Sequence, residues 1–524
     1  MDTKALRQKV LDLAIRGKLV PQDPSDEPAS VLLERIRQQK QQMVKEGKLK
    51  AKDIKNDTII FVGEDNLHYE KFTDGSVKCI EVDIPFELPK GWAWERLSNL
   101  ATFSGGKTPS TSRREYWDGE VLWVTSKDMK SKYITSSQLR LSVLGAEQMQ
   151  IYQPDTLLLV TRSGILRHTL PIAILKECAT VNQDLKAIVL YMPELAEYVY
   201  VCLKGMESQL LLKYTKSGTT VENVNFDEFQ KVLLPIAPFQ EIRKIIEATS
   251  EATIVVSSIE DEKAAMAEYI VKAKAKILDL AIRGQLVSQD PTDEPASVLL
   301  EQIRAEKEEL VQQGKIKRDK KESVIFRGED NSYYLRTGEL VESLEGWAFE
   351  DLPDSWSVCC LGELCDYGNC TNVDTADIAD SAWMLDLEDI EKDSGVVLQK
   401  VRKAERNAAS TKHRFHKGQV LYSKLRPYLN KVVLADEDGY CTSEILPLEF
   451  ERNILPQYAR YYLMSPAFLR YANKCSYGVK MPRLGTADGK KAIISIPPFE
   501  EQKRIVLAIE LAFAQLGFIA ESLA

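Results

Sequence analysis

Three groups of residues in this 524-residue chain have types and spacings that could do chemistry. The first lies in the segment ATFSGGKTPS, where Gly106, Lys107 and Thr108 match the end of a phosphate-binding loop, G-x-x-x-x-G-K-[ST]. Ala101 stands where that motif needs its first glycine, which shapes the nest of backbone N–H groups around the phosphates. We therefore assign no nucleotide site to this segment.

The second group fits a metal-dependent nuclease. Asp155 begins the apolar segment DTLLLVT, and Asp184 precedes Lys186 by two positions. Two carboxylates and a lysine near strand ends could hold Mg²⁺ and position a water molecule. The competing interpretation is structural, with Asp155 capping a turn and Lys186 on the surface of a strand. A Mg²⁺-dependent nuclease is therefore the alternative function among enzymes.

The third group is a cysteine cluster that resembles part of a zinc site. Its members are Cys359, Cys360, Cys365 and Cys370. A zinc site combines one pair of closely spaced cysteines with a second such pair or with histidines. The histidines His413 and His416 lie far from this cluster in the sequence, so a zinc site is not indicated. We predict buried thiols, because free cysteine packs as a small apolar residue. The sequence has no G-x-G-x-x-G motif and no Asn-Pro-Pro-aromatic or Asp-Pro-Pro-aromatic tetrapeptide, so we expect no catalysis, metal or cofactor in this chain.

Loops that are basic, polar and aromatic are the better candidates for function, as DNA contacts. Lys and Arg side chains and backbone N–H groups position a protein on phosphates, while Arg, Asn and Gln hydrogen-bond base edges. In the first half of the chain the predicted DNA-binding residues are Gly106, Lys107, Thr108, Ser110, Arg113, Arg114, Arg162, Asn182 and Gln183. In the second half they are Arg402, Lys403, Arg414, Lys424, Arg426, Tyr428, Lys431, Lys480 and Arg483. For each, the competing interpretation is a solvated charged surface.

The elements that must position these loops are revealed by an internal repeat. Leu11–Arg37 and Leu278–Arg304 agree at 23 of 27 positions, and further repeated segments follow each copy. The repeated segments thus form two similar frames. Each frame is followed by an insert of about domain size, and the two inserts differ in sequence. The predicted domains are an N-terminal frame (1–87), a first insert (88–238), a central frame with a long helix (239–351), a second insert (352–498) and a C-terminal half-helix (499–524).

The frames also carry a helical seam. Apolar residues recur at steps of three and four from Ile242 to Leu280, the spacing of a coiled coil. A matching seam is divided between Leu6–Leu13 and Ile505–Leu523, at the two ends of the chain. This circular arrangement predicts two long antiparallel helices, one continuous and one split, with a pseudo-two-fold axis relating two mixed α/β inserts. A second amphipathic helix should end near Gly47 and again near Gly314, each followed by a hairpin with GEDN as its turn.

Composition limits the class of protein. A 44% hydrophobic and 28% charged chain is typical of a soluble globular protein. The net charge of −9 argues weakly against binding to nucleic acid. However, the excess negative charge lies outside the two inserts, which are themselves near neutral. The start MDTKALRQKV has no apolar leader, and Ile505–Ala520 contains Glu510 and Gln515, so we expect a cytoplasmic protein without a membrane span.

Along its whole length the chain resembles the specificity subunits of type I restriction–modification systems. The resemblance is carried by LPKGWAWERL, NQDLKAI and LPIAPFQEIRKI in the first half and by LPDSWSVCCLGEL, VLYSKLRPYLNK and IPPFEEQKRI in the second. It implies two target-recognition domains on a helical spacer, each recognising half of a bipartite, asymmetric site in double-stranded DNA. It also implies a non-catalytic subunit that binds two modification and two restriction subunits. S-adenosylmethionine, ATP and Mg²⁺ would act on those partners. A coiled-coil scaffold that never touches DNA is the remaining alternative.

Overall fold

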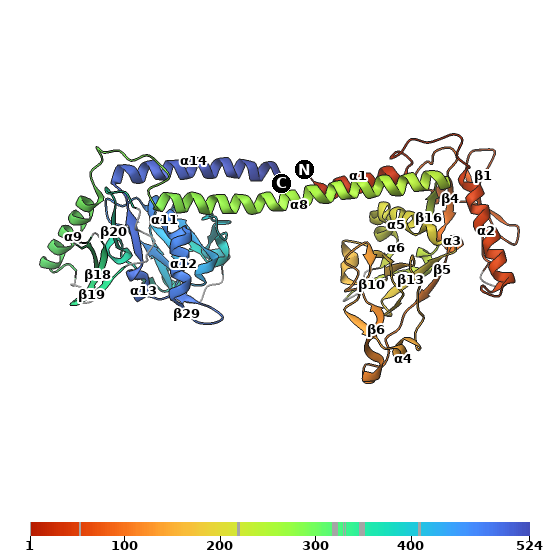
Figure 1. Ribbon diagram of the computed structural model, residues 1–524, viewed down its shortest axis with the longest axis horizontal. Coiled ribbons are helices and arrows are strands. Elements are labelled where there is room, and N and C mark those ends of the chain that lie inside the picture. Colours follow the sequence, from red (N-terminus) through yellow and green to blue (C-terminus); the bar gives the residue numbers. More distant parts are fainter. Residues whose placement is uncertain are drawn as a thin grey trace. The chain divides into compact units, whose positions relative to one another are not determined.

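The computed structural model describes residues 2–51, 54–216, 221–316, 323–328, 330, 332–344, 352–406 and 410–523. The chain divides into two compact units, Met1–Glu262 and Lys263–Ala524 (Figure 1). Each unit contains one copy of the repeated frame and one α/β insert. The helix α8 (Phe239–Ile282) contributes its first half to the first unit and its second half to the second.

The frame of the first unit consists of two helices and a small sheet. Helix α1 (Thr3–Ile15) is preceded by Asp2 as its N-cap. The Asp2 side chain accepts from the Ala5 N–H at 3.0 Å, which satisfies one of the N–H groups that have no partner within the first helical turn. Helix α2 (Ala29–Lys45) ends before Gly47, which has φ +73°. Strands β1 (Ile59–Val62), β2 (His68–Lys71) and β3 (Val77–Cys79) form an antiparallel sheet in that order. The predicted GEDN hairpin is confirmed here, and β3 adds a strand that was not predicted.

The first insert is entered and left through one antiparallel pair, β4 (Ala93–Arg96) with β16 (Leu233–Ile236). Its strands are β5 (Ala101–Gly105), β6 (Trp117–Val124), β7 (Tyr133–Ile134), β8 (Leu139–Leu141), β9 (Leu157–Val160), β10 (Arg162–Ser163), β11 (Ile172–Leu175), β12 (Ala179–Val181), β13 (Leu185–Leu190), β14 (Thr215–Lys216) and β15 (Glu222–Val224). Its helices are α3 (Leu97–Leu100), α4 (Val143–Ala146), α5 (Ala196–Gly205), α6 (Glu207–Tyr214) and α7 (Phe226–Phe229). The main sheet has the order β5-β13-β9-β11-β7, and the wholly buried β9 lies at its centre.

The second unit repeats this plan. Its frame contains α9 (Ala296–Gln312) and the sheet of β17 (Ser323–Arg327), β18 (Tyr333–Thr337) and β19 (Leu340–Ser343). Its insert opens and closes with β20 (Ser357–Cys360) paired to β31 (Ile493–Ile496). The strands between are β21 (Asn372–Val373), β22 (Trp383–Leu385), β23 (Val401–Arg402), β24 (Lys412–Phe415), β25 (Val420–Ser423), β26 (Val432–Leu434), β27 (Gly439–Thr442), β28 (Ile445–Leu448), β29 (Ser476–Tyr477) and β30 (Arg483–Leu484). The helices are α10 (Leu361–Leu364), α11 (Pro456–Met464), α12 (Pro466–Cys475), α13 (Thr486–Lys491) and the terminal α14 (Phe499–Leu523).

The two inserts share a strand scheme although their sequences differ. Strand β6 runs parallel to β12 and antiparallel to β8, just as β22 runs parallel to β27 and antiparallel to β23. Strand β9 lies between β11 and β13 in antiparallel pairs, as β25 lies between β26 and β28. The repeat therefore extends through the inserts at the level of topology.

Three helices carry the predicted seam. On α8, Ile242, Ile245 and Val256 are buried in the first unit, where Arg7 of α1 reaches Glu260 at 3.0 Å. In the second unit Lys274 of α8 lies over the ring of Phe513 of α14, 5.4 Å from its centroid. By length and composition alone α14 could cross a membrane, and it is the one helix among the described residues of which this holds. Its first turns nevertheless bury Ile505 and Ile509 in the core of the second unit.

Candidate nucleic-acid interface

Two distant loops of the first insert meet where β5 ends, at Gly105 and Gly106. The Lys107 N–H donates to the carbonyl oxygen of Val181 at 3.2 Å, so the loop after β5 lies on the loop after β12. A Cβ atom on Gly106 would lie 1.9 Å from that oxygen, which leaves no room for any side chain. The glycine is thus required for close backbone approach, and its resemblance to a phosphate-binding loop is coincidental.

Thr108 and Gln183 meet at this junction, and both are exposed. The Thr108 hydroxyl donates to Oε1 of Gln183 at 2.5 Å, which leaves the two amide N–H donors of Gln183 free to meet an acceptor. Asn182 is different, because only 6% of it is exposed and its amide is used locally. Its Oδ1 accepts from the Asp184 N–H and its Nδ2 donates to Asp184 Oδ2, both at 3.2 Å. Asn182 therefore shapes the loop that presents Gln183.

The cations of the first insert divide into free and engaged side chains. Lys107, Arg114 and Arg162 are exposed, and the described part of the chain offers their side chains no ion pair or hydrogen bond. Arg162 lies beside the Gln183 loop, because the neighbouring Thr161 N–H donates to the Asp184 carbonyl at 2.8 Å. Arg113 instead donates to the Tyr116 hydroxyl at 2.8 Å.

Ser110 is exposed in the same loop as Lys107 and Thr108. Its carbonyl accepts from Trp117 Nε1 at 3.2 Å, which ties the loop to β6. Its hydroxyl lies 2.8 Å from that of Ser112. The structure thus gathers Gly106, Lys107, Thr108 and Gln183 at one junction, with Arg162 beside it.

Four of the nine predicted residues in the second insert use their charge within the domain. Arg402 pairs with Glu437 at 2.6 Å, and Lys403 Nζ donates to the Ile378 carbonyl at 2.6 Å. Lys431 Nζ donates to the Leu387 carbonyl at 2.6 Å, and burial lowers the pKa of this amine. Arg483 forms a two-pronged pair with Glu444, with Nη2 2.7 Å and Nε 3.0 Å from Oε1. Their cationic groups therefore stabilise the insert.

Of the five remaining predicted residues, Lys480 lies between strands β29 and β30, and Lys424 and Arg426 bond to this hairpin through their backbones. The Leu484 N–H donates to the Lys424 carbonyl at 3.0 Å, and the Arg426 N–H donates to the Pro482 carbonyl at 2.7 Å. Arg426 has φ +50°, and its Nε is buried without a hydrogen-bond partner. The side chains of Arg414, Lys424 and Lys480 have no ion pair within the described ranges, and Tyr428 is 47% exposed.

The hairpin tip also holds apolar residues that the sequence argument missed. Val479 is fully exposed, Tyr477 is 63% exposed and Met481 is 47% exposed. Gly478 turns the chain between them with φ +99°. A glycine between aromatic, aliphatic and basic residues was the available signal in YGVKMP. An exposed apolar tip that also carries Lys480 suits the major groove of DNA, where thymine methyl groups offer apolar contacts among the hydrogen-bonding groups of the bases.

The nuclease arrangement is not assembled. Leu185 pairs with Val160, so Asp184 lies at the end of β9, whereas Asp155 precedes the start of that strand. Asp155 instead pairs with Lys176 at 2.9 Å, and Lys186 lies over the Phe226 ring. The two carboxylates are separated by the length of a strand and cannot share a metal ion.

Three of the four thiols of the cysteine cluster are packed in the core, as predicted, whereas the fourth, that of Cys370, is only half-buried. Cys359, Cys360 and Cys365 are buried, and burial raises the pKa of each of these thiols. His413 Nδ1 lies 2.9 Å from the Ile445 carbonyl, while His416 Nδ1 lies 3.1 Å from Asp438. Within the described ranges no three His, Cys, Asp or Glu residues are grouped so that they could hold a metal ion.

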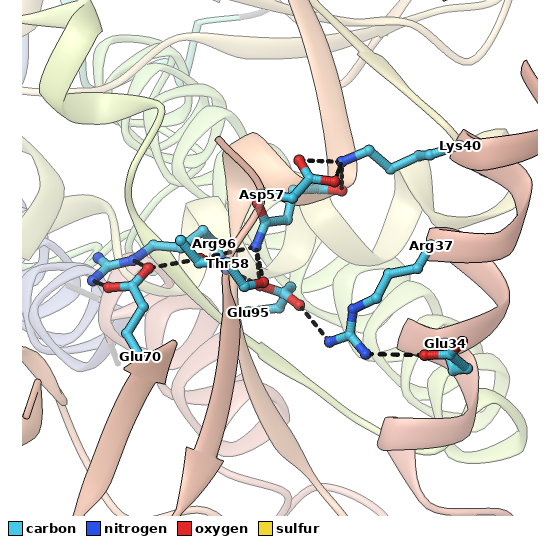
Figure 2. A network of polar contacts seen from close by, with 9 residues as sticks. Glu34, Arg37, Lys40, Asp57, Thr58, Glu70, Glu95 and Arg96 are labelled. Atoms are coloured by element: carbon cyan, nitrogen blue, oxygen red, sulfur yellow. Dashed lines mark hydrogen bonds and ion pairs between the residues drawn. The ribbon is translucent and has the colours of Figure 1, made fainter. Parts of the chain in front are cut away.

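A buried polar network joins the first insert to its frame (Figure 2). Glu95, 2% exposed, accepts from Asn99 Nδ2 at 2.6 Å and lies 3.6 Å from Arg37 of α2. Burial raises the pKa of Glu95 to about 7, because desolvation outweighs the Asn99 hydrogen bond and the Arg37 charge. Lys40 of α2 adds a hydrogen bond to the Asn99 carbonyl at 3.2 Å.

The second unit makes the same junction with a different carboxylate. Arg304 of α9 donates to Glu363 Oε2 at 2.8 and 3.0 Å, and Lys307 donates to the Glu363 carbonyl at 2.7 Å. Glu363 takes the place of Asn99, and Cys359 takes the place of Glu95. A helix of the frame therefore holds each insert through the same two cations.

The comparisons agree with this architecture. The family model described as "Type I restriction modification DNA specificity domain" matches residues 89–264 and 353–515. The Type I restriction enzyme EcoEI specificity subunit of Escherichia coli is 27% identical over 418 residues, 66% of this chain and 63% of that protein. The EcoAI specificity subunit of Escherichia coli is 26% identical over 401 residues, 66% and 64% of the two chains. This chain thus spans slightly less than two thirds of these relatives.

One solved structure supports the fold. Its title is "Structural basis underlying complex assembly and conformational transition of the type I R-M system". It aligns with a TM-score of 0.51 at 15% identity, over 84% of this chain and 94% of the other. The similarity covers both units, so the α/β fold with two inserts is one that occurs in a solved protein.

Proposed function

Because the chain belongs to the family of type I restriction–modification DNA specificity domains, we propose that it is the DNA-recognising subunit of such a system. Each insert contacts one half of a bipartite, asymmetric site in double-stranded DNA. The chain itself performs no catalysis. It directs partner subunits to the DNA sequence that its two inserts select.

The observation that carries this proposal is a shared arrangement of loops in two inserts of unlike sequence. In the first, the Thr161 N–H donates to the Asp184 carbonyl, and the Thr161 carbonyl accepts from Val224 at 2.9 Å. In the second, the Lys424 N–H donates to the Glu444 carbonyl, and the Lys424 carbonyl accepts from Leu484, both at 3.0 Å. One scaffold thus presents two different sets of exposed side chains, as expected when each insert recognises a different sequence.

We propose that α8, with α1 on one unit and α14 on the other, forms the coiled-coil spacer between the inserts. The buried positions Ile242, Ile245, Val256 and Ile270 of α8 follow the predicted seam. A continuous helix paired with a split one would let a circularly repeated chain hold two recognition domains. The exposed Leu511 and Phe518 of α14 leave apolar surface for partner helices.

The proposed partners are two modification and two restriction subunits, which would bring S-adenosylmethionine, ATP and Mg²⁺. The site of action would be the cytoplasm, where such a complex meets DNA.

The test is DNA binding by the full chain assembled with its modification subunit, over a range of salt concentrations. The proposal predicts binding to a preferred duplex that falls steeply with salt, because phosphate contacts release counterions. Binding that is absent or insensitive to salt, in a complex that assembles normally, would contradict it and favour a scaffold that does not touch DNA.

A further inference from the structure

The loop between β12 and β13 presents Gln183 on a backbone that is fixed on both sides. On one side the Asn182 N–H donates to the Val124 carbonyl at 3.0 Å. On the other side the Asp184 carbonyl accepts from the N–H and from the hydroxyl of Thr161, at 2.8 and 3.1 Å. Gln183 itself is exposed. The loop therefore holds one exposed side chain at a defined place on the surface of the first insert.

The end of the Gln183 side chain is fixed as well. The Thr108 hydroxyl donates to Gln183 Oε1 at 2.5 Å. The loop of Thr108 is anchored next door, where the Lys107 N–H donates to the Val181 carbonyl at 3.2 Å and the Lys107 carbonyl accepts from Trp123 Nε1 at 3.3 Å. A side chain that is already held loses less freedom when it binds a ligand. Gln183 keeps one acceptor site on Oε1 and two N–H donors on Nε2, so its amide is a pre-oriented donor beside an acceptor.

This pair of groups matches one base. In the major groove adenine offers its N7 acceptor beside its N6 amino donor, and a glutamine amide can bond both at once. Guanine offers two acceptors there, which would leave Oε1 facing a second oxygen. Lys107 and Arg162, exposed on either side of the loop, can contact phosphates and so set the position of the insert on the duplex.

The second insert carries a different residue at the same place in its scaffold. Ser443 is exposed and precedes Glu444, whose carbonyl accepts from the Lys424 N–H at 3.0 Å. Gln183 likewise precedes the residue whose carbonyl accepts from Thr161. A serine hydroxyl both donates and accepts, so it selects no single base. The backbone of this loop is therefore retained in both inserts while the exposed side chain changes, which is expected of a position that sets sequence preference.

We propose that Gln183 recognises an adenine in the major groove of one half-site, and that Thr108 is the residue that positions its amide. This rests on the proposed function, in which the first insert contacts one half of the DNA site. It adds the base that this insert requires at one position and the side chains that require it. Asn182 makes no base contact, because its amide is used within the loop.

In the experiment the full chain, assembled with its modification subunit, first selects its preferred duplex from a randomised pool. Each adenine of that duplex is then replaced in turn by 7-deazaadenine, which lacks the N7 acceptor but keeps the N6 amino group. Fluorescence anisotropy gives the affinities of the wild type, Gln183→Ala, Thr108→Val and Thr108→Ser. Gln209→Ala is the matched control, because Gln209 is an exposed glutamine of α6 in the same insert. Urea unfolding verifies that all variants remain folded.

We expect 7-deazaadenine to weaken wild-type binding about tenfold at one adenine, because the Nε2 donor of Gln183 loses its acceptor. Gln183→Ala should bind the unmodified duplex about tenfold more weakly and should not respond to the replacement at that adenine. Thr108→Val should lose part of this affinity, whereas Thr108→Ser, which keeps the hydroxyl, should bind as the wild type does. Gln209→Ala should respond to every replacement as the wild type does.

Three results would overturn the inference and leave the proposed function intact. The first is an equal response of the wild type and Gln183→Ala to the replacement at every adenine. The second is a preferred duplex that contains no adenine. The third is a loss of affinity in Gln183→Ala that is the same for all duplexes, which would make this side chain a phosphate contact. An assembled wild-type chain that prefers no duplex would contradict the proposed function itself.

Discussion

Free and engaged lysines of the second insert should respond differently to salt. We consider the double variant Lys424→Ala with Lys480→Ala, in which both amines lack an ion pair among the described residues. Each phosphate contact contributes about 0.9 to the slope of log affinity against log salt, so losing two lowers it by about 1.8. Between about 50 and 200 mM salt, a fourfold change, the wild type should lose about 12-fold more affinity than the variant.

The assay is fluorescence anisotropy with a labelled duplex and the chain assembled with its modification subunit. The matched control is Lys403→Ala with Lys431→Ala, which removes the same charge from amines held by the Ile378 and Leu387 carbonyls. The control should leave the slope unchanged and lower the free energy of unfolding. Equal slope changes in both double variants would refute the distinction drawn between free and engaged cations.

Three further predictions concern residues that hold the two inserts in shape. Asp389→Ala should lower the free energy of unfolding by about 3 kcal/mol in urea denaturation, because it removes two charge-assisted hydrogen bonds from Arg406 to a fully buried carboxylate and leaves Arg406 paired with Asp386. An unchanged midpoint would contradict this. Gly106→Ala should weaken DNA binding at least tenfold, because the added Cβ atom would lie 1.9 Å from a carbonyl oxygen. The control Gly164→Ala should bind as the wild type does, because nothing lies within 4 Å of its added Cβ atom. Equal affinities of the two variants would contradict this. Because the pKa of Glu95 is raised to about 7 in the folded state, the contribution of Glu95 to stability is greatest below the pKa of the unfolded state and is lost as pH rises through 7, by at most about 3 kcal/mol. Glu95→Gln should therefore flatten this fall in urea midpoints measured across pH. An unaltered pH profile in the variant would count against the argument.

The repeated frame was predictable from the sequence because its signals are local. The helix ends at Gly47 and Gly314, each with positive φ, follow from the ordinary behaviour of glycine after a last helical turn. The long α8 follows from a spacing of three and four. Strand β3 escaped prediction because three residues, VKC, give too short a pattern.

The sites in the inserts were less predictable because they depend on contacts between distant residues. Whether Arg402 faces DNA or Glu437 is decided by a partner 35 positions away. The meeting of Gly106 with Val181 likewise depends on how β5 and β12 are placed. In the first insert the prediction selected the cations Lys107, Arg114 and Arg162, which are exposed, but in the second insert it counted charges that the insert uses internally. The common strand scheme could not be inferred, since its apolar positions accept many residue types.

The central claim is that each insert recognises one part of a divided DNA sequence. It is tested most directly by letting the full chain, assembled with its modification subunit, select from a pool of randomised duplexes, followed by sequencing of the bound fraction. The account predicts a two-part asymmetric motif with a gap of constant length that carries no preference. A single short motif, or no enrichment at all, would contradict it.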